Sequence, residues 1–529
     1  MTHALVLAFL SGFVALSYEI LWYRAYSFVS GGAAPAFALL LALYLAGIAI
    51  GSRASRRFCS GEEPGRLSLA LGRFILLANL LGYLFVPLLS WVMTLNDVPW
   101  TRTVPLVAVV SCGLGAILPL VSHQAVAPDA RAGARVSWIF FANILGSASG
   151  SLLTGFWLTD YWSLRQISLF LGILGAIMGA VALQAGVRGL RLIPRMLGAA
   201  AVAGLAVLLN PWIFDGLYER LVHKAFYTPS FRFLHLVENR SGVIAVYPDG
   251  TFLGGGRYDG SVNTSIETDR NGVSRAYAVS GLHPRPREIL MVGLSTGSWA
   301  QAVADNPDVE RLTVIEINRG YLELIRKYPE VSGVLDHPKV RIEIDDARRW
   351  LVRHRDRKFD MIISNTTPHW RSHVTSLLSL EFLELVRSRL NPGGILFYGT
   401  TGSHPAAHTG LTVFPHGVEL KGGNQFLALG EQPVDFVPER WKASMRRHRR
   451  MGRLMFDPAD PAKQDRLDRL AAGFDSQYVP CDELRRAVAP VFCDTAFNMG
   501  EMLDSLALDH VTNLTPRLVP FFRDLPGAY

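Results

Sequence analysis

The sequence predicts a multi-pass α-helical membrane domain followed by an α/β domain of Rossmann type, with a small β unit before the second domain. Three observations lead to this prediction. Half of the 529 residues are hydrophobic, 18% are charged and the mean hydropathy is +0.24, a composition too apolar for an ordinary soluble protein. Long apolar runs occupy the first 214 residues. From residue 288 onwards, short apolar strands alternate with helices.

Apolar runs of about 20 residues, the length that crosses the bilayer core, recur in the first part of the chain. We expect seven membrane spans, at 4–28, 36–52, 68–94, 104–122, 136–158, 166–186 and 196–214. The first run continues into Tyr18, Glu19 and Trp22 without a small-residue cleavage site, which argues against a cleaved signal peptide. The expected domains are a transmembrane domain (1–214), a linker with the small β unit (215–287), the Rossmann-like domain (288–430) and a C-terminal helical extension (431–529).

Arginines between the expected spans predict the orientation of the chain. Nine fall in alternate loops and two in the others. The nine are Arg53, Arg56, Arg57, Arg66, Arg131, Arg135, Arg188, Arg191 and Arg195, against Arg102 and Arg165. Because cytoplasmic loops are enriched in arginine and lysine, seven spans in a bacterial inner membrane would place the α/β domain in the periplasm. One span fewer would place it in the cytoplasm.

The basic charge of the chain belongs to these loops. Residues 1–214 carry a net charge of +7 and the remainder carries +1. The sequence pI of 9.3 therefore reflects arginines flanking apolar segments and gives no support to nucleic acid as a partner. The expected partners are the lipid bilayer, a small nucleoside ligand and other membrane proteins.

Polar residues inside the spans are candidates for function because they are costly in lipid. They are Glu19, Arg24, His123 and Asn143. The favoured interpretation is nevertheless structural: hydrogen bonds between helices, with the long side chains reaching towards the interface. The glycines Gly47, Gly51, Gly146, Gly150 and Gly155 are typical of closely packed helices.

The cysteines predict neither a disulfide scaffold nor a metal site. The chain has four cysteines, and neither a C-x-x-C pair nor a His/Cys cluster has zinc spacing. Cys481 and Cys493, twelve residues apart, would form a bridge in an oxidising compartment, although two isolated thiols are an equally good interpretation.

The soluble part reads as a β unit followed by a strand–helix alternation. Residues 235–267 alternate in short β-like pieces with turn signals. The expected strands that follow are 288–292, 312–317, 340–344, 359–364 and 394–398, with helices at 298–305, 321–328 and 377–390. This alternation predicts a parallel sheet covered by helices on both faces, with a ligand at the carboxyl ends of the strands where the strand order reverses.

Three motifs at the expected strand ends point to a nucleoside. The first strand ends in a loop with Gly293 and Gly297, where the backbone can approach a ligand at a helix amino terminus. Glu316 ends the second strand, where a carboxylate can accept both ribose hydroxyls. Asp346, in Asp345-Asp346-Ala347 after the third strand, can accept from an adenine amino group. The alternative is an inherited fold with an empty pocket.

With these motifs the chain resembles the spermidine synthase family, and more closely the membrane proteins described as fused major-facilitator-like/spermidine synthase proteins. The matches in the soluble part are the Gly293 loop, Tyr258-Asp259-Gly260, Ile315-Glu316-Ile317-Asn318, Asp345-Asp346-Ala347 and Asn391-Pro392-Gly393-Gly394. In the membrane part, 12–24, 45–52 and 143–146 look like that family's first, second and fifth spans. The resemblance implies a spermidine synthase or methyltransferase type of fold. It also implies S-adenosylmethionine or its decarboxylated form as donor, without a metal.

The chain departs from the family's pattern at the catalytic acids. The Asp of the family's glycine loop, which faces the aminopropyl amine, is Thr296 here, and its catalytic Asp after the fourth strand matches Asn365. Its active-site Tyr matches Phe414, and its Tyr-His or Tyr-Gln pair is matched approximately by Ser274-Arg275. An amide cannot act as a base at neutral pH and attracts a diammonium far less than a carboxylate does. Ordinary spermidine synthesis is therefore not expected.

Basic side chains near the same motifs suggest a different acceptor. His369, Arg371, His373 and His416 would suit an anionic or neutral acceptor, or would form a solvated basic loop. Three functions remain open. The first is a transferase with an unknown acceptor, and the second is a non-catalytic sensor or membrane-complex subunit. The third, a transporter, is weakened because about seven spans are expected where the major-facilitator fold has two six-helix halves.

Overall fold

The computed structural model describes residues 1–59, 64–95, 98–184, 192–365, 368–372, 374–421 and 425–486. The chain divides into two compact units: the first runs from Met1 to Val243 and the second begins at Ile244. The division falls inside strand β2 (Gly242–Val246). Each unit has its own hydrophobic core and is described separately.

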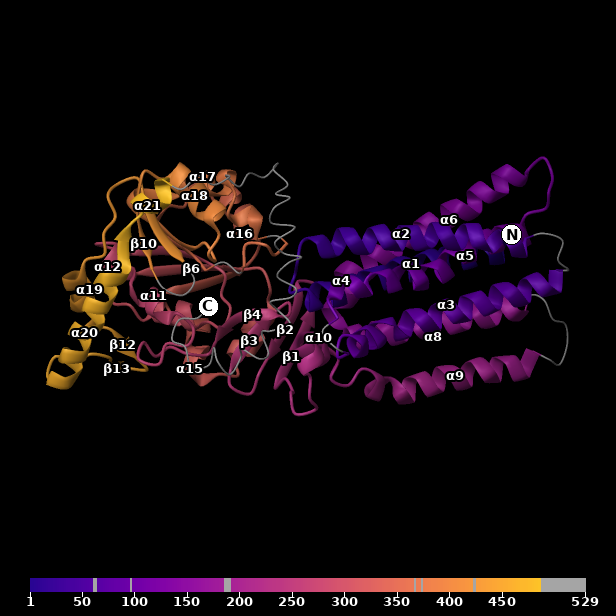
Figure 1. The fold of residues 1–529 in the computed structure, drawn as a ribbon, viewed down its shortest axis with the longest axis horizontal. Coiled ribbons are helices and arrows are strands. Elements are labelled where there is room, and N and C mark those ends of the chain that lie inside the picture. Colours follow the sequence, from indigo (N-terminus) through magenta and orange to yellow (C-terminus); the bar gives the residue numbers. More distant parts are fainter. Residues whose placement is uncertain are drawn as a thin grey trace. The chain divides into compact units, whose positions relative to one another are not determined.

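The first unit is a bundle whose long helices run side by side (Figure 1). The long helices are α1 (Thr2–Val29), α2 (Pro35–Ser55), α3 (Pro64–Val92), α5 (Pro105–Ala125), α6 (Ala132–Leu153), α8 (Leu164–Gln184) and α9 (Leu192–Ile213). Short helices are α4 (Trp100–Thr103), α7 (Thr159–Tyr161) and α10 (Leu217–His223), and strand β1 (His235–Asn239) follows them. A π-helical turn, Thr154–Leu158, extends α6.

Six helices in the described part of the chain are long and apolar enough to cross a membrane. The sequence predicts seven, so the count differs by one. The predicted span at 196–214 coincides with α9, but the apolar stretch counted there, Ala203–Ile213, is shorter than a membrane span. Helix α9 nevertheless packs in the bundle, because Tyr83 of α3 donates a hydrogen bond of 3.1 Å to Asn210 Oδ1.

Glycines set the closest helix contacts in this unit. A Cβ atom added at Gly146 of α6 would lie 1.8 Å from the Phe9 carbonyl oxygen of α1, and one at Gly150 would lie 2.3 Å from that of Phe13. Between α2 and α5, a Cβ at Gly51 would lie 1.9 Å from the Cys112 carbonyl oxygen. These pairs of helices can approach only where the side chain is absent, as small-residue packing requires.

The second unit is built around an eight-stranded sheet of order β14-β10-β11-β9-β8-β5-β6-β7. Five strands are parallel: β5 (Glu288–Val292), β6 (Arg311–Glu316), β7 (Val340–Ile344), β8 (Phe359–Ser364) and β9 (Leu390–Gly399). The expected wholly parallel sheet is therefore wrong at one side, where β10 (His416–Leu420), β11 (Phe426–Gly430) and β14 (Tyr478–Pro480) run antiparallel. The short connection between β10 and β11 permits a hairpin, whereas parallel strands need crossover connections.

Helices cover this sheet and a smaller sheet precedes it. The helices are α11 (Val273–Tyr277), α12 (Val279–Leu282), α13 (Ser298–Ala304), α14 (Gly320–Ile325), α15 (Pro329–Ser332), α16 (Ala347–Arg353), α17 (Leu380–Arg387) and α18 (His404–Val413). The helix expected at 377–390 begins later, at Leu380, because the Ser379 side chain caps it by accepting from Phe382 N. In the small sheet, β3 (Thr251–Gly254) pairs antiparallel with β2 and with β4 (Arg257–Ser261).

The C-terminal extension is not purely helical. Besides α19 (Pro438–Met445), α20 (Pro461–Gln477) and α21 (Asp482–Arg486), it contains the hairpin β12 (Arg449–Arg450) and β13 (Arg453–Leu454) and the sheet strand β14. Residues 487–529 of the expected extension, with Cys493, lie outside the described residues. The Cys481–Cys493 bridge therefore stays a prediction; Cys481 itself is buried.

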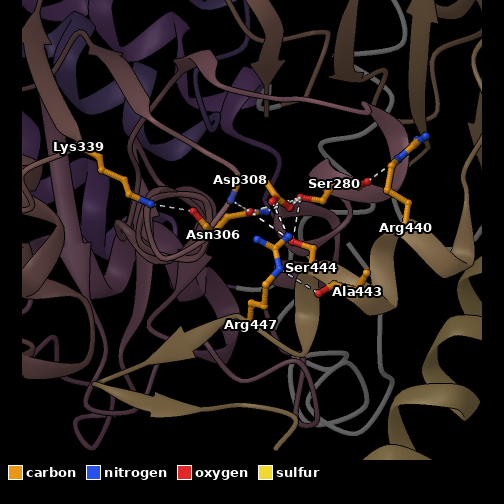
Figure 2. Close-up of polar contacts among 8 residues, drawn as sticks. All are labelled: Ser280, Asn306, Asp308, Lys339, Arg440, Ala443, Ser444 and Arg447. Atoms are coloured by element: carbon orange, nitrogen blue, oxygen red, sulfur yellow. Dashed lines mark hydrogen bonds and ion pairs between the residues drawn. The ribbon is translucent and has the colours of Figure 1, made fainter. Parts of the chain in front are cut away.

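A polar network joins the extension to the α/β core (Figure 2). Asn306 Nδ2 donates to the Ser280 hydroxyl at 2.9 Å, and the Ser444 hydroxyl of α19 lies 3.1 Å from the same oxygen. Ser280 in turn donates to Asp308 at 2.9 Å, and Arg447 forms an ion pair of 2.6 Å with Asp308. Because its polar atoms are partnered, this part of the extension belongs to the folded core rather than to a loose tail.

Candidate active site

The glycine loop after β5 has the backbone that the motif predicts. Gly293 and Gly297 have φ angles of +89° and +79°, which favour glycine, and Ser295 between them has +49°. The loop turns through a hydrogen bond of 2.9 Å from Gly297 N to the Leu294 carbonyl oxygen, and α13 begins at Ser298. A loop of this shape exposes backbone atoms at the carboxyl end of the central strand, next to β8, where the strand order reverses.

Glu316 ends β6 beside this loop and is 4% exposed. Its Oε2 accepts from Leu294 N at 2.7 Å and its Oε1 accepts from Asn318 N at 2.8 Å. Burial raises the pKa of Glu316 to about 7, although the backbone N–H groups favour the charged form. The carboxylate therefore ties the glycine loop to the end of β6, and each oxygen keeps one further lone pair for a ligand.

Asp346 follows β7 and caps α16, its side chain accepting from Arg349 N at 2.7 Å. The neighbouring Asp345 forms ion pairs with Arg349 and Arg353. The structure thus brings Gly293, Gly297, Glu316 and Asp346 to the carboxyl ends of three adjacent parallel strands, β5, β6 and β7. This is the arrangement that the sequence motifs predict for a nucleoside.

The two neutral replacements lie at the same edge of the sheet. Thr296 is 1% exposed, and its hydroxyl lies 2.8 Å from the Ser298 hydroxyl and donates to the Ser261 carbonyl oxygen at 3.3 Å. Asn365 directly follows β8 and is exposed. Neither side chain carries a charge that could hold a cationic amine.

Phe414 and His416 are not part of this edge, contrary to expectation. The Phe414 ring is fully buried in the core against the large sheet. His416 begins β10 opposite Gly430, and Gly430 pairs with Ile395 near the amino-terminal part of β9. Because β10 and β11 form an antiparallel hairpin on β9, the start of β10 lies at the opposite edge from the glycine loop.

The other expected basic side chains near the site have internal partners. His369 Nδ1 lies 2.9 Å from the Thr401 hydroxyl. Arg371 donates to the Gly254 carbonyl oxygen at 3.0 Å. Arg275, the approximate match to the second residue of the family's Tyr-His or Tyr-Gln pair, is 7% exposed, with its guanidinium 4.7 Å from the centre of the Phe426 ring. His373 lies outside the described residues.

Asp259 of β4 carries a half-buried carboxylate beside the glycine loop. The sequence does not predict this proximity. Asp259 accepts a hydrogen bond from the Tyr321 hydroxyl of α14, and its carbonyl oxygen accepts one from the Ser295 hydroxyl of the glycine loop. Burial raises the pKa of Asp259, while Tyr321 and the nearby Arg371 oppose this shift. Asp259 lies in the motif Tyr258-Asp259-Gly260, whereas Tyr321 has no sequence signal because it reads as an ordinary helix residue.

The polar residues of the helical unit have separate environments. Asn143 donates to the Ala8 carbonyl oxygen at 3.0 Å, and Arg24 donates to those of Asn239 and Gly242 at 2.7 and 3.4 Å. Glu19 is 8% exposed, and His123 is exposed near the end of α5. The hydrogen bonds of Asn143 and Arg24 are of the structural kind that the sequence favours.

Metal binding has no support in the described residues, among which no group of three or more His, Cys, Asp or Glu side chains could hold a metal ion. The described carboxylates nearest the glycine loop are the half-buried Asp259 and the buried Glu316.

Comparison with known proteins identifies the central part of the second unit. Residues 276–412 match the model of the spermine/spermidine synthase domain. The chain is 30% identical to the polyamine aminopropyltransferase of Desulforudis audaxviator over 184 residues, 34% of this chain and 63% of that protein. It is 34% identical to the spermidine synthase of Dictyostelium discoideum over 115 residues, 22% of this chain and 40% of that protein.

A solved spermidine synthase from Thermotoga maritima aligns with a TM-score of 0.35 and 21% identity, over 40% of this chain and 77% of that chain. A spermidine synthase solved with the transition state analogue AdoDATO aligns with a TM-score of 0.35 and 22% identity, over 40% and 78%. The chain spans 40% and 63% of the length of the two curated relatives described above. The second unit therefore contains a spermidine synthase-like domain.

Proposed function

We propose that the chain is a membrane-anchored transferase that takes a group from an adenosyl sulfonium, S-adenosylmethionine or its decarboxylated form. The observation that carries this proposal is the convergence of Gly293, Gly297, Glu316 and Asp346 at adjacent strand ends. In such a reaction the acceptor attacks the carbon next to the sulfonium, and the carbon–sulfur bond breaks to leave a neutral thioether. The protein's part is to bind the adenosine and to hold donor and acceptor in line.

The acceptor in this proposal is not a simple diamine. Thr296 and Asn365 offer a hydroxyl and an amide where a diammonium would need carboxylates. An anionic acceptor also loses support, because Arg371 is engaged with the Gly254 carbonyl oxygen and lies close to Asp259. A neutral nucleophile fits the described side chains best.

A second candidate is a non-catalytic protein that binds a nucleoside as a sensor or membrane-complex subunit. It is favoured by the internal use of the side chains that should act on a substrate. The Thr296 hydroxyl is bonded within the loop region, and Asn365 carries no ionisable group. A domain of this kind would bind a thioether such as 5′-methylthioadenosine without catalysing a reaction.

Anchoring in a bilayer is supported by the aromatic side chains of the span that contains α6. Trp138 and Trp157 are 60% and 57% exposed and stand 19 residues apart. At 1.5 Å per residue this is about 28 Å, close to the thickness of roughly 30 Å of the hydrocarbon core. Phe140 and Phe141 near one end and Phe156 and Tyr161 near the other are also exposed. Aromatic belts at both membrane interfaces have this spacing.

Nucleoside binding is the direct test of the proposal. We expect the full-length protein in detergent to bind 5′-methylthioadenosine, and Glu316→Ala to weaken binding by about 10- to 100-fold, corresponding to the roughly 1.5–3 kcal/mol of hydrogen bonds to a charged group. Isothermal calorimetry gives the affinity. Glu310→Ala, an exposed change before the same strand, should leave it unaltered. If millimolar ligand produces no heat of binding and no thermal shift, nucleoside binding is refuted.

Membrane orientation is tested separately. If the nine arginines face the cytoplasm and α9 crosses the bilayer, alkaline phosphatase fused after Tyr529 should be active and a fluorescent protein that matures only in the cytoplasm should stay dark. The reverse pattern would mean that α9 does not cross the bilayer. It would also give the α/β unit access to a donor made in the cytosol, which favours the transferase over the non-catalytic candidate.

A further inference from the structure

We propose that Glu19, Trp22 and Tyr44 form a binding site for a small protonated amine inside the helical unit. The site lies in a different unit from the strand ends described above and goes beyond the proposed function, because it gives the helices a ligand of their own. Glu19 and Trp22 belong to α1, and Tyr44 belongs to α2. In this site the carboxylate holds the ammonium group and the aromatic rings surround it.

Three polar groups of this site are buried without a hydrogen-bond partner in the described part of the chain. The Trp22 Nε1 and the Tyr44 hydroxyl are enclosed, and their residues are 0% and 3% exposed. Glu19 is 8% exposed, and among the described residues it neither accepts a hydrogen bond nor forms an ion pair. Buried polar groups are nearly always partnered in proteins, and a buried charge without a partner is especially costly. A ligand that contacts these groups would remove that cost.

The three side chains converge from two helices. Glu19 and Trp22 are three residues apart in α1, a spacing that places side chains next to each other on one face of a helix. Tyr44 approaches them from α2, because the centres of the Trp22 and Tyr44 rings are 6.2 Å apart with the rings edge to face. Glu19 also interacts electrostatically with the Tyr44 hydroxyl. The carboxylate, the hydroxyl and the indole N–H group are therefore neighbours.

Aromatic rings form the wall of this site. Besides Tyr44, the Trp22 ring contacts Tyr18 of the same helix and Phe85 of α3, with ring centres 5.9 and 4.6 Å apart. The Tyr18 hydroxyl donates to the Asn79 carbonyl oxygen at 3.2 Å, which holds this ring in place. Aromatic rings attract cations, and cages of such rings recognise ammonium groups. A carboxylate beside these rings therefore favours an ammonium group over a neutral ligand.

The nearest basic residue of the same helix does not neutralise Glu19. Arg24 donates instead to the carbonyl oxygens of Asn239 and Gly242, at 2.7 and 3.4 Å. Calcium or magnesium would need about six oxygen ligands, whereas this site offers the oxygens of one carboxylate and one hydroxyl. The Trp22 N–H group can only donate, so it requires an acceptor on the ligand. These features define the ligand class as a small protonated amine that carries a hydrogen-bond acceptor.

The experiment measures binding of three small molecules to the full-length protein in detergent, by calorimetry at about pH 7, where aliphatic amines are protonated. The molecules are 2-aminoethanol, which is a cation with an acceptor, ethylamine, which is a cation without one, and neutral ethylene glycol. We expect 2-aminoethanol to bind about tenfold more tightly than ethylene glycol, the order expected of one cation contact in a desolvated aromatic site. Ethylamine should bind less tightly than 2-aminoethanol, because it leaves the Trp22 N–H group without an acceptor.

Glu19→Gln keeps the shape of the side chain and removes its charge. This variant should lose the preference for the cations over ethylene glycol. Without any amine, its thermal unfolding temperature should equal or exceed that of the wild type, because an uncompensated buried charge is removed. A carboxylate with a purely structural role would instead lower the unfolding temperature when it is replaced. This second measurement therefore separates ligand binding from a structural role of Glu19.

Two further variants test the surroundings of the carboxylate. Tyr44→Phe keeps the ring and removes only the hydroxyl, so it should weaken the binding of both amines several-fold and leave the preference for cations. Asp129→Asn removes an exposed carboxylate that pairs with Arg135 in the same unit, and it should bind all three molecules as the wild type does. It is the matched control for the loss of one negative charge.

The inference is overturned if the wild type binds the amines no more tightly than ethylene glycol, or if Glu19→Gln keeps the preference for cations. In the first case a proton, rather than an amine, neutralises Glu19. Equal affinities of 2-aminoethanol and ethylamine would overturn the role assigned to the Trp22 N–H group. None of these measurements involves the nucleoside, so their failure leaves the proposed function untouched.

Discussion

Two buried glutamates show how differently the two units of this chain handle polar groups. Glu19 in α1 and Glu316 at the end of β6 are 8% and 4% exposed. Glu316 accepts two backbone hydrogen bonds, whereas Glu19 accepts none from the described residues. Near Glu19, the Trp22 Nε1 and the Tyr44 hydroxyl are also buried without a described partner. In the α/β unit the buried carboxylate organises a loop, whereas the buried Glu19 makes no such contact with the described residues of the helical unit.

Shape takes over that role among the helices. Gly146, Gly150 and Gly51 allow backbones to meet at distances that exclude even a methyl group. In the bilayer proposed for this bundle, helix association brings little hydrophobic gain, so close contact between helices would supply the specificity. The comparison teaches that a steric change should be most damaging in the first unit and a charge change in the second.

The largest expected effect is therefore steric. Gly146→Ala would place a Cβ 1.8 Å from the Phe9 carbonyl oxygen, so α1 and α6 must separate. We expect the free energy of unfolding to fall by about 3 kcal/mol, the upper end of the usual range for an overpacked contact. Thermal unfolding in detergent measures it. Gly133→Ala on the same helix, with nothing within 4 Å, is the matched control. If the two variants unfold alike, glycine packing does not hold this pair of helices.

The charge of Glu316 should give the next largest effect, as a pH dependence of stability. Its pKa is raised to about 7, above that of the unfolded chain, so the native state holds the proton more tightly. This contribution is fully present below the unfolded pKa and is lost as the pH rises through about 7. A shift of this size amounts to about 3 kcal/mol at most. Denaturant unfolding between pH 4 and 8 gives the free energy of unfolding of the wild type and of Glu316→Gln. The prediction is contradicted if the two free energies depend on pH in the same way.

The smallest effect tests a single polar contact between helices. Asn143→Ala removes the 3.0 Å hydrogen bond to the Ala8 carbonyl oxygen. Interhelical hydrogen bonds of this kind contribute about 0.6 kcal/mol on average, so thermal unfolding should shift only slightly. Asn143→Leu keeps bulk without the hydrogen bond and should behave like the alanine variant. A loss as large as that expected for Gly146→Ala would mean that polarity, not shape, holds α1 to α6.

Local sequence patterns were sufficient for much of this protein. Apolar length predicts the long helices because a bilayer span has a fixed thickness, and the alternation from 288 onwards predicts the five parallel strands within a few residues. Glycine at 293 and 297 and a carboxylate at 316 are placed by chain geometry alone, since each directly follows or ends a strand. For the same reason the sequence alone predicts that these residues lie together at the carboxyl edge of the sheet.

Only the tertiary structure shows in which direction consecutive strands run and which residues far apart in sequence come into contact. The hairpin of β10 and β11 reverses the chain and carries His416 to the far edge of the sheet, and Phe414 turns into the core. Asp259, Tyr321 and Arg371 meet although 62 and 50 residues separate them in sequence. Periodicity records which face of an element is apolar but not which way the next strand runs or which side chains converge. Those features follow from long-range packing, and the meeting of Asp259, Tyr321 and Arg371 is therefore a property of the fold.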